Sequence, residues 1–224
     1  MNESRRLKHP SESGAPRRWA PAARCFAPPS AWTGGRVVLS PEESHHLLHV
    51  LRVRAGDVVH VLDGQGRSAD ALVTEPDPRS AALDVTAETR HPPPRPAVRL
   101  AQGLPKGRKM DGIVQKAVEI GVQAVIPLET ERRVARPDPG RWAGRLGRWE
   151  RIAIEAAKQC GAAWLPRIEA PRDVSGLLAS EPPETVLLMG SLTEGAPPLR
   201  RVLEAARRGG VERLTALIGP EGDF

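Results

Sequence analysis

A glycine-rich loop after an apolar run is the part of this sequence best suited to hold a ligand. The residues Gly219-Pro220-Glu221-Gly222 directly follow the apolar run at 214–218. Open α/β sheets bind ligands at the carboxyl ends of their strands, and glycines let the backbone approach a ligand closely. The sequence has neither a G-x-G-x-x-G fingerprint nor a Walker A motif, so ordinary dinucleotide and nucleoside-triphosphate sites are disfavoured.

Two basic clusters also follow predicted strands and are suited to contacts with phosphate. Lys106, Arg108 and Lys109 lie at the start of a predicted helix, where the helix dipole disfavours cations unless an anion is bound. Arg132 and the two arginines within 133–136 follow the next strand, and guanidinium groups bind phosphate in a bidentate manner. The alternative for both clusters is a solvated basic turn.

A third cluster, Lys158-Gln159-Cys160-Gly161, ends a predicted helix. Gly161 is expected to cap the helix, Gln159 can hydrogen-bond a base edge, and Lys158 can complement the helix dipole. Cys160 is expected to be packed on the apolar side of its helix. Cys25 is the only other cysteine, so a disulfide scaffold and a zinc site are both excluded by count.

Composition places the chain among ordinary globular proteins. It has 224 residues, is 40% hydrophobic and carries a net charge of +6, but six basic and only two acidic residues lie within 1–24, so the remainder is nearly balanced. Aromatic residues make up 3% of the chain, which disfavours broad platforms for stacking single-stranded bases. No apolar stretch approaches membrane-spanning length and no secretory signal is present. We therefore expect a cytoplasmic protein without membrane contact.

The elements that position these clusters fall into two regions of different pattern. Residues 1–23 are predicted to be a disordered basic extension. Residues 24–89 contain several short predicted strands, which indicates a small β-barrel. A stiff, proline-rich linker is predicted at 90–96. Strands and helices alternate in 97–224, which predicts an α/β domain with a parallel sheet covered on both faces.

Individual elements follow from capping signals and periodicity. Ser40-Pro41-Glu42 begins a helix with a capping serine, a first-turn proline and an acid. Apolar residues recur at spacings of three and four between 142 and 160, which predicts an amphipathic helix of about five turns. The predicted helices are 40–51, 108–120, 142–160 and 199–207, and the predicted strands are 37–39, 57–63, 67–74, 81–87, 98–102, 122–128, 186–189 and 214–218.

Six segments, taken together and in order, carry a resemblance to a known family. They are residues 43–53, 106–111, 115–122, 130–132, 152–161 and 218–222. In this order they resemble the family of ribosomal RNA small-subunit methyltransferases E, whose members make N3-methyluridine in 16S rRNA. The resemblance covers about residues 24–224.

The resemblance implies a PUA-like β-barrel that helps bind RNA and a C-terminal SPOUT domain with a trefoil knot. It further implies S-adenosylmethionine as the methyl donor, 16S rRNA of the small ribosomal subunit as the substrate, and a homodimer. It implies no metal. The implied cofactor-binding residues are Met189, Gly190, Leu217, Ile218, Gly219, Pro220, Glu221 and Gly222.

The same resemblance suggests which side chains contact RNA and which take part in catalysis. Glu221 and Arg132 are the catalytic candidates, but the sequence does not identify the base that removes the N3 proton. The alternative for Glu221 is a structural role in which its carboxylate accepts from the amides of its own loop. The implied RNA-binding residues are His46, Arg52, Lys106, Arg108, Lys109, Arg132 and Gln159.

Three departures from the family pattern leave alternatives open. Asp223 stands where the family usually has glycine, and Ala162 stands where it usually has arginine. The family's last helix would follow Phe224, so we expect a truncated knot and an incomplete cofactor pocket. Two functions therefore stay open: an rRNA uridine-N3 methyltransferase, and an RNA-binding pseudoenzyme that lacks a complete cofactor site. A structural dimerisation module has little support.

Overall fold

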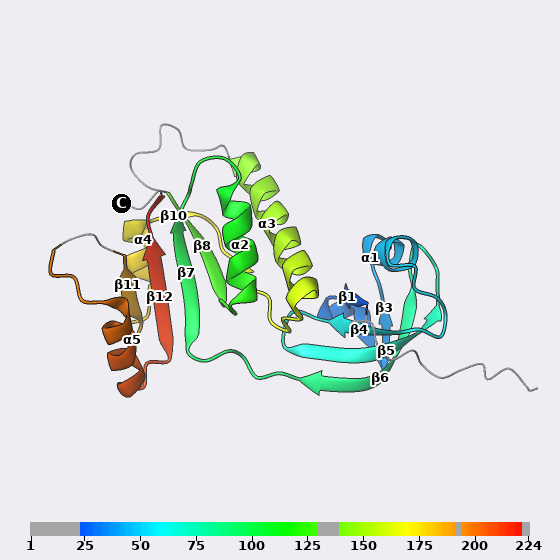
Figure 1. Ribbon diagram of the computed structural model, residues 1–224. Helices are drawn as coiled ribbons and strands as arrows, with labels where there is room; N and C mark the ends of the chain where they lie inside the picture. Colours follow the sequence, from blue (N-terminus) through cyan, green and yellow to red (C-terminus); the bar gives the residue numbers. More distant parts are fainter. Residues whose placement is uncertain (1–22, 130–138, 191–193, 221–224) are drawn as a thin grey trace, which may run out of the picture.

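The computed structural model describes residues 23–129, 139–190 and 194–220, which form two β-sheets with their helices (Figure 1). Almost all of the predicted N-terminal extension therefore lies outside the described residues. The first sheet ends with a strand at Ala82–Arg90, and the second begins at Ala97–Gly103. The change from a β pattern to an α/β pattern along the sequence corresponds to this passage from one sheet to the other.

The first sheet is a mixed sheet with one helical segment. Its order is β1-β4-β5-β6-β3-β2, and every neighbouring pair is antiparallel except β1 and β4. The helical segment consists of α1 (Pro41–His45) and η2 (His46–Val50), and the Ser40 side chain caps it by accepting from the Glu43 N–H. A short turn, η1 (Pro29–Ala31), precedes β2. The strands are β1 (Arg24–Phe26), β2 (Trp32–Thr33), β3 (Arg36–Val38), β4 (Val58–Leu62), β5 (Arg67–Glu75) and β6 (Ala82–Arg90).

The second sheet is parallel throughout. Its order is β10-β8-β7-β12-β11, with β9 also paired to β8. This confirms the predicted α/β class with a parallel sheet. The strands are β7 (Ala97–Gly103), β8 (Ala124–Glu129), β9 (Arg167–Ile168), β10 (Arg172–Asp173), β11 (Val186–Met189) and β12 (Arg213–Ile218).

Helices cover both faces of this sheet because successive strand residues point to opposite sides. Val125 packs with α2 (Lys109–Glu119) and α3 (Pro139–Cys160) in one apolar cluster. Its neighbour Ile126 packs on the other face with Leu177 of α4 (Val174–Ser180). The last helix, α5 (Leu199–Arg208), has no buried residue. The α2–α3 pair forms one outer layer, visible in Figure 1 between the parallel sheet and the curled first sheet; we call the first sheet with its helical segment the barrel.

The buried residues of α3 recur at the predicted spacing, but one predicted burial is wrong. Trp149, Ala153 and Ala157 are buried, as the spacing of three and four predicts. Cys160 is exposed, so the expectation that it packs on the apolar side is wrong. The apolar stripe ends at Ala156 and Ala157, and the last turn of α3 lies against β1, where Arg24 binds two of its carbonyls. Cys25 is the buried cysteine.

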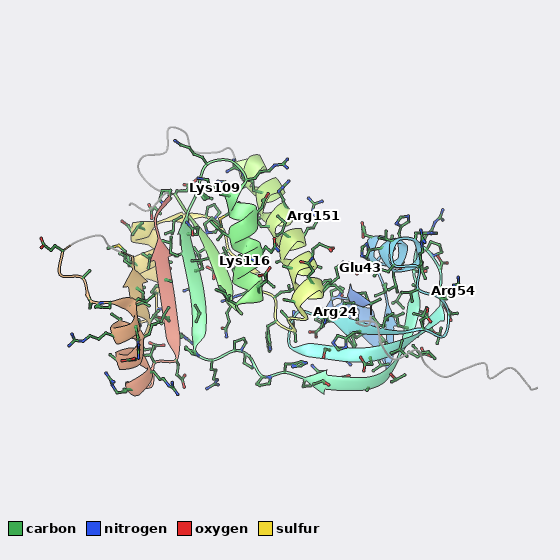
Figure 2. All side chains as sticks on the ribbon, viewed as in Figure 1. Arg24, Glu43, Arg54, Lys109, Lys116 and Arg151 are labelled. Atoms are coloured by element: carbon green, nitrogen blue, oxygen red, sulfur yellow. The ribbon has the colours of Figure 1, made fainter. Side chains whose placement is uncertain are left out.

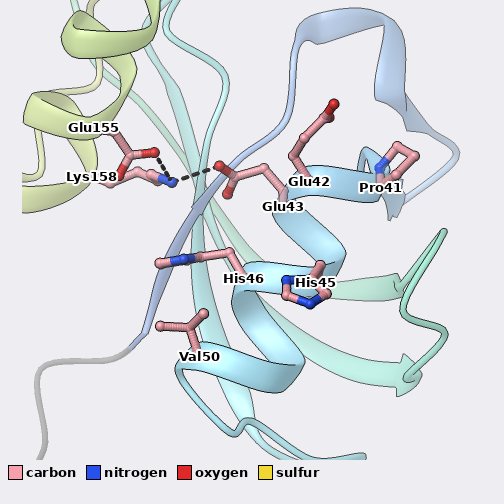
Figure 3. A pocket seen from close by; sticks show the side chains of 8 residues that line it. All are labelled: Pro41, Glu42, Glu43, His45, His46, Val50, Glu155 and Lys158. Carbon is pink, nitrogen blue, oxygen red and sulfur yellow. Dashed lines mark hydrogen bonds and ion pairs between the residues drawn. The ribbon is translucent and has the colours of Figure 1, made fainter.

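A buried ion pair connects the barrel to the end of α3. Lys158 Nζ lies 2.6 Å from Glu43 Oε1 and 2.7 Å from Glu155 Oε1 (Figure 3). The other Glu43 oxygen accepts from the Phe26 N–H at 3.1 Å. Arg24 Nη1 donates to the carbonyls of Lys158 and Gln159, at 3.1 and 2.8 Å. Burial by itself lowers the pKa of Lys158, but the bonds to Glu155 and Glu43 outweigh burial and the pKa is raised.

A second contact between the two parts runs through backbone groups. The Gly66 N–H donates to the Ala163 carbonyl, and the Leu165 N–H donates to the Gly64 carbonyl, both at 2.9 Å. Gly64 has φ +74°, and a Cβ there would lie 2.6 Å from Leu165 Cδ1. The predicted glycine turn therefore closes the β4–β5 hairpin and also leaves space for the segment after α3.

Replacement of Lys158 by methionine should destabilise the chain, because Glu43 would remain in a site where its side chain is only 13% exposed. Loss of one partner of a buried ion pair typically costs about 3–5 kcal/mol. We expect the free energy of unfolding in urea at pH 7 to fall by about 3 kcal/mol. Introducing Glu43→Gln into the Lys158→Met variant should restore part of the lost stability, since the unpaired charge is then removed.

The difference in free energy of unfolding between wild type and Lys158→Met should change with pH in a definite direction. Lys158 has a raised pKa in the folded state, so its contribution is fully present below the unfolded value of 10.5 and is lost as the pH rises through the folded value. The gap between wild type and Lys158→Met should therefore shrink as the pH rises above about 10.5. A gap that does not shrink at high pH would contradict the assignment to Lys158.

The two cysteines should differ in reactivity. Burial, together with the nearby Glu43 carboxylate, raises the pKa of the Cys25 thiol far above its ordinary value. We expect Ellman's reagent at about pH 8 to modify one thiol rapidly in the native chain and two after denaturation. Cys160→Ser should abolish the rapid phase. Two rapid thiols in the native protein would show that β1 opens readily.

Candidate cofactor site and nucleic-acid interface

Parallel pairing brings the predicted cofactor residues to one edge of the second sheet. Met189 of β11 pairs with Leu217 of β12, and Ile218 pairs with Gln102 of β7. We call the carboxyl ends of β7, β11 and β12, with the residues that follow them, the carboxyl edge. Met189, Gly190, Leu217, Ile218, Gly219 and Pro220 all lie there, so the structure brings together every described member of the predicted set.

The loop after β12 packs closely against the end of β7. A Cβ added to Gly103 would lie 2.7 Å from the Pro220 nitrogen and 3.1 Å from the Gly219 carbonyl carbon. Since real Cβ atoms essentially never approach so closely, only glycine at 103 permits this loop path. Gly190 borders the same edge, where its N–H lies 3.4 Å from the Leu217 carbonyl oxygen.

A buried amide that is not among the predicted site residues holds this loop. Gln102 is 5% exposed, and its Nε2 donates to the carbonyls of Gly103, Ile218 and Gly219, at 2.9, 3.3 and 3.5 Å. A buried polar side chain is stable only when it is hydrogen-bonded. The feature of the sequence that indicates this residue is a glutamine inside an otherwise apolar predicted strand, immediately before a glycine.

The carboxyl edge offers apolar surface beside backbone polar groups. Leu217 is buried at 4% exposure, whereas Met189 and Ile218 leave 60% and 47% of their surface exposed. A flat, uncharged ring could lie on such side chains while neighbouring backbone groups hydrogen-bond its edge. Three predicted site residues, Glu221, Gly222 and Arg132, lie outside the described residues, so their roles stay predictions.

The predicted RNA contacts separate into two groups. Lys106, Arg108 and Lys109 are exposed in the loop after β7 and at the start of α2, on the carboxyl edge. The other group lies at the barrel end of the molecule: half-buried His46, exposed Arg52, and exposed Gln159 of α3. Figure 2 shows Lys109 at the end of α2 remote from the barrel, and Glu43 and Arg24 at the barrel end of α3.

An ion pair fixes α2 against α3 between these groups. Arg148 donates from Nε to Asp111 Oδ1 at 3.1 Å and from Nη2 to Asp111 Oδ2 at 2.6 Å. This fork geometry suits a guanidinium–carboxylate pair. The bond from Arg148 outweighs burial and lowers the pKa of Asp111. The two helices are therefore held together by polar as well as apolar contacts.

Within the part of the chain that the structure describes, no group of three or more His, Cys, Asp or Glu side chains could hold a metal ion. No described helix is long and apolar enough to cross a membrane.

Comparison with known proteins relates both sheets to RNA methyltransferases. Residues 92–224 match the family model of an RNA methyltransferase domain, and residues 39–86 match an RNA methyltransferase PUA domain. The chain is 32% identical over 204 residues to ribosomal RNA small subunit methyltransferase E of Synechocystis, covering 91% of this chain and 65% of the relative. Against the Bacillus subtilis protein of the same name it is 33% identical over 133 residues, covering 58% of this chain and 51% of the relative.

The chain thus spans less than two thirds of the length of these two relatives. A crystal structure of ribosomal RNA small subunit methyltransferase E from Neisseria gonorrhoeae, bound to S-adenosyl methionine, superposes with a TM-score of 0.78 at 30% identity. That match covers 91% of this chain and 82% of the other. The first sheet is accordingly PUA-like, and the parallel sheet has the SPOUT arrangement. This chain belongs to the ribosomal RNA small subunit methyltransferase E family.

Proposed function

We propose that this chain transfers a methyl group from S-adenosylmethionine to N3 of a uridine in 16S rRNA of the small ribosomal subunit. The observation that carries this proposal is the close packing of Gly219 and Pro220 against Gly103 at the carboxyl edge. Family membership supports the reaction class, and the S-adenosyl methionine in the Neisseria relative supports the choice of cofactor.

The side chains present at the carboxyl edge fit such a cofactor. Exposed Met189 and Ile218 would contact the adenine ring, and backbone groups of Leu217, Gly219 and Pro220 would meet its polar edge. Gln102 maintains the loop path by its bonds to three carbonyls. When bound, S-adenosylmethionine supplies a methyl group on a positively charged sulfur.

The chemistry of uridine explains what the basic residues at this edge would do. N3 carries a proton and lies on the Watson–Crick edge, so the target base must be unpaired when it reaches the site. Lys106, Arg108 and Lys109 would hold adjacent phosphates, and positive charge nearby stabilises a uridine that has lost its N3 proton. Holding donor and acceptor in line supplies a large part of the rate enhancement. Glu221 and Arg132 stay the candidates for a catalytic role, and the base that removes the N3 proton stays unassigned.

Each region of the chain would have its own role in this reaction. We propose that residues 24–89 act as the RNA-binding barrel, residues 90–96 as the linker, and residues 97–224 as the methyltransferase domain. The partners are 16S rRNA within the small subunit and a second copy of the chain in a homodimer.

The reaction product tests this function directly. Small ribosomal subunits that lack the modification should accept a labelled methyl group from S-adenosylmethionine in the presence of the chain. Nucleoside analysis by chromatography and mass spectrometry should identify N3-methyluridine as the labelled product. A different methylated nucleoside would refute the N3 position, while unlabelled rRNA from a folded sample would favour the RNA-binding pseudoenzyme.

Gly103→Ala should weaken cofactor binding, because the added Cβ would displace Pro220 and Gly219. We expect calorimetric titration with S-adenosylmethionine to show an affinity about tenfold lower than wild type, which corresponds to about 1.4 kcal/mol. Gly112→Ala is the matched control, since a Cβ at Gly112 on α2 meets nothing within 4 Å. Equal affinities for both variants would exclude the Gly103 contact as a determinant of the pocket.

A further inference from the structure

Strand β11, which brings Met189 to the carboxyl edge, has little apolar anchoring. It lies at one margin of the described parallel sheet and pairs there only with β12 (Figure 1). None of its four residues is buried. The helix before it, α4, buries only Leu177, and the helix after it, α5, buries no residue. Since apolar burial is the main contribution that stabilises a fold, the segment from α4 to β11 depends on other contacts to stay on the sheet.

Those contacts come from ion pairs near the amino ends of the strands. Arg99 of β7 lies two residues before Ala101, which packs with Leu177, so Arg99 points to the face that α4 covers. Its Nη2 donates to both carboxylate oxygens of Glu169, at 3.1 and 3.2 Å. Its Nη1 donates to Glu181, which directly follows α4. One guanidinium group on β7 thus binds two segments that are distant from it in the sequence.

A second arginine completes this group of charges. Arg172 of β10 donates from Nη2 to Glu169 Oε2 and from Nη1 to Ser180 Oγ at the end of α4, both at 2.9 Å. Two arginines therefore balance two glutamates. The side chains of Arg99, Glu169 and Glu181 are only 17%, 16% and 4% exposed, so salt screens these charges little. We call Arg99, Glu169, Arg172 and Glu181 the amino-edge cluster.

We propose that Arg99 is a positioning residue for the cofactor site. Through Glu181 it holds the turn at 181–185 against β7 and thereby fixes the start of β11, whose far end carries Met189 and Gly190. The Thr185 N–H closes this turn on the Pro182 carbonyl at 2.9 Å, and β11 begins at the next residue. The effect on the cofactor rests on the proposed function, whereas the effect on β11 does not.

Buried polar atoms beside Arg99 favour opening of this region. Thr215 of β12 pairs with Arg99 on one side and with Leu187 of β11 on the other. Its Oγ1 is buried without a hydrogen-bond partner among the described residues, as are Thr185 Oγ1, Glu181 Oε2 and Arg99 Nε. Such atoms destabilise the closed arrangement and gain bonds to water once it opens. The ion pairs of Arg99 therefore oppose an opening that the neighbouring groups favour.

Hydrogen exchange followed by mass spectrometry on the intact chain, without cofactor, tests this role. Arg99→Met should raise the exchange rates of peptides that cover 186–190 by about tenfold, because β11 then opens more often. The matched control is Arg67→Met on the first sheet. Arg67 is 20% exposed and pairs with Glu88 at 2.6 Å, so this variant loses a comparable ion pair. It should leave exchange at 186–190 unchanged.

A second variant separates positioning from mere compensation of buried charge. Arg99→Met leaves Glu169 and Glu181 without their partner on β7, which lowers the stability of the whole chain. In Arg99→Met/Glu169→Gln/Glu181→Gln these charges are gone, so the urea midpoint should return toward that of wild type. Fast exchange at 186–190 should persist, since residue 181 then has no cation on β7 to bind. Wild-type exchange at 186–190 in either variant would overturn the proposal.

Calorimetric titration with S-adenosylmethionine connects β11 to the cofactor site. Arg99→Met should bind about fivefold more weakly than wild type, because only the fraction of molecules with β11 in place is competent. Arg67→Met should bind as wild type does, and equal affinity of Arg99→Met and wild type would refute the positioning role. If wild type binds no cofactor, the proposed function fails. Faster exchange at 186–190 in Arg99→Met than in Arg67→Met would still support the hold of Arg99 on β11.

Discussion

The buried ion pair between Lys158 and Glu43 determines how the barrel is placed against the parallel sheet. Glu43 uses one oxygen for Lys158 and the other for the backbone of β1, while Arg24 of β1 binds the last carbonyls of α3. Buried charges are tolerated only when they are paired and hydrogen-bonded. The end of α3 and the start of the barrel helix must therefore meet in one arrangement, which the backbone contacts at Gly64 and Gly66 reinforce.

Parallel topology supplies the second constraint. Strands that are distant in the sequence end at one edge because all of them run in the same direction. This edge gathers the loop after β12, the end of β11 and the basic loop after β7. Gln102 and Gly103 determine the path of the loop after β12. Gln102 donates to three carbonyls, and Gly103 leaves room for the loop because it has no Cβ. The proposed methyl transfer uses this edge for the cofactor and its basic rim for phosphates.

The two constraints together separate the two groups of predicted RNA contacts. The ion pair fixes the barrel at one end of the α2–α3 layer, and the parallel topology places the predicted cofactor loop at the other end of the sheet. The exposed basic residues of the carboxyl edge and the predicted contacts on the barrel therefore lie at opposite ends of the α2–α3 layer.

Local patterns in the sequence determined the elements, and the tertiary structure decided which residues meet. The three-and-four spacing predicts α3, and the alternation of strands and helices predicts the parallel sheet, because burial of one face imposes a period on the chain. No local pattern shows that Lys158 pairs with Glu43, 115 residues away, or that Cys160 projects into solvent beside the barrel. The short strands β9 and β10 likewise depend on pairing with β8, and helix α4 depends on Ile126 and Leu128, on which it packs. These features depend on contacts between distant segments, which form only when the whole chain packs.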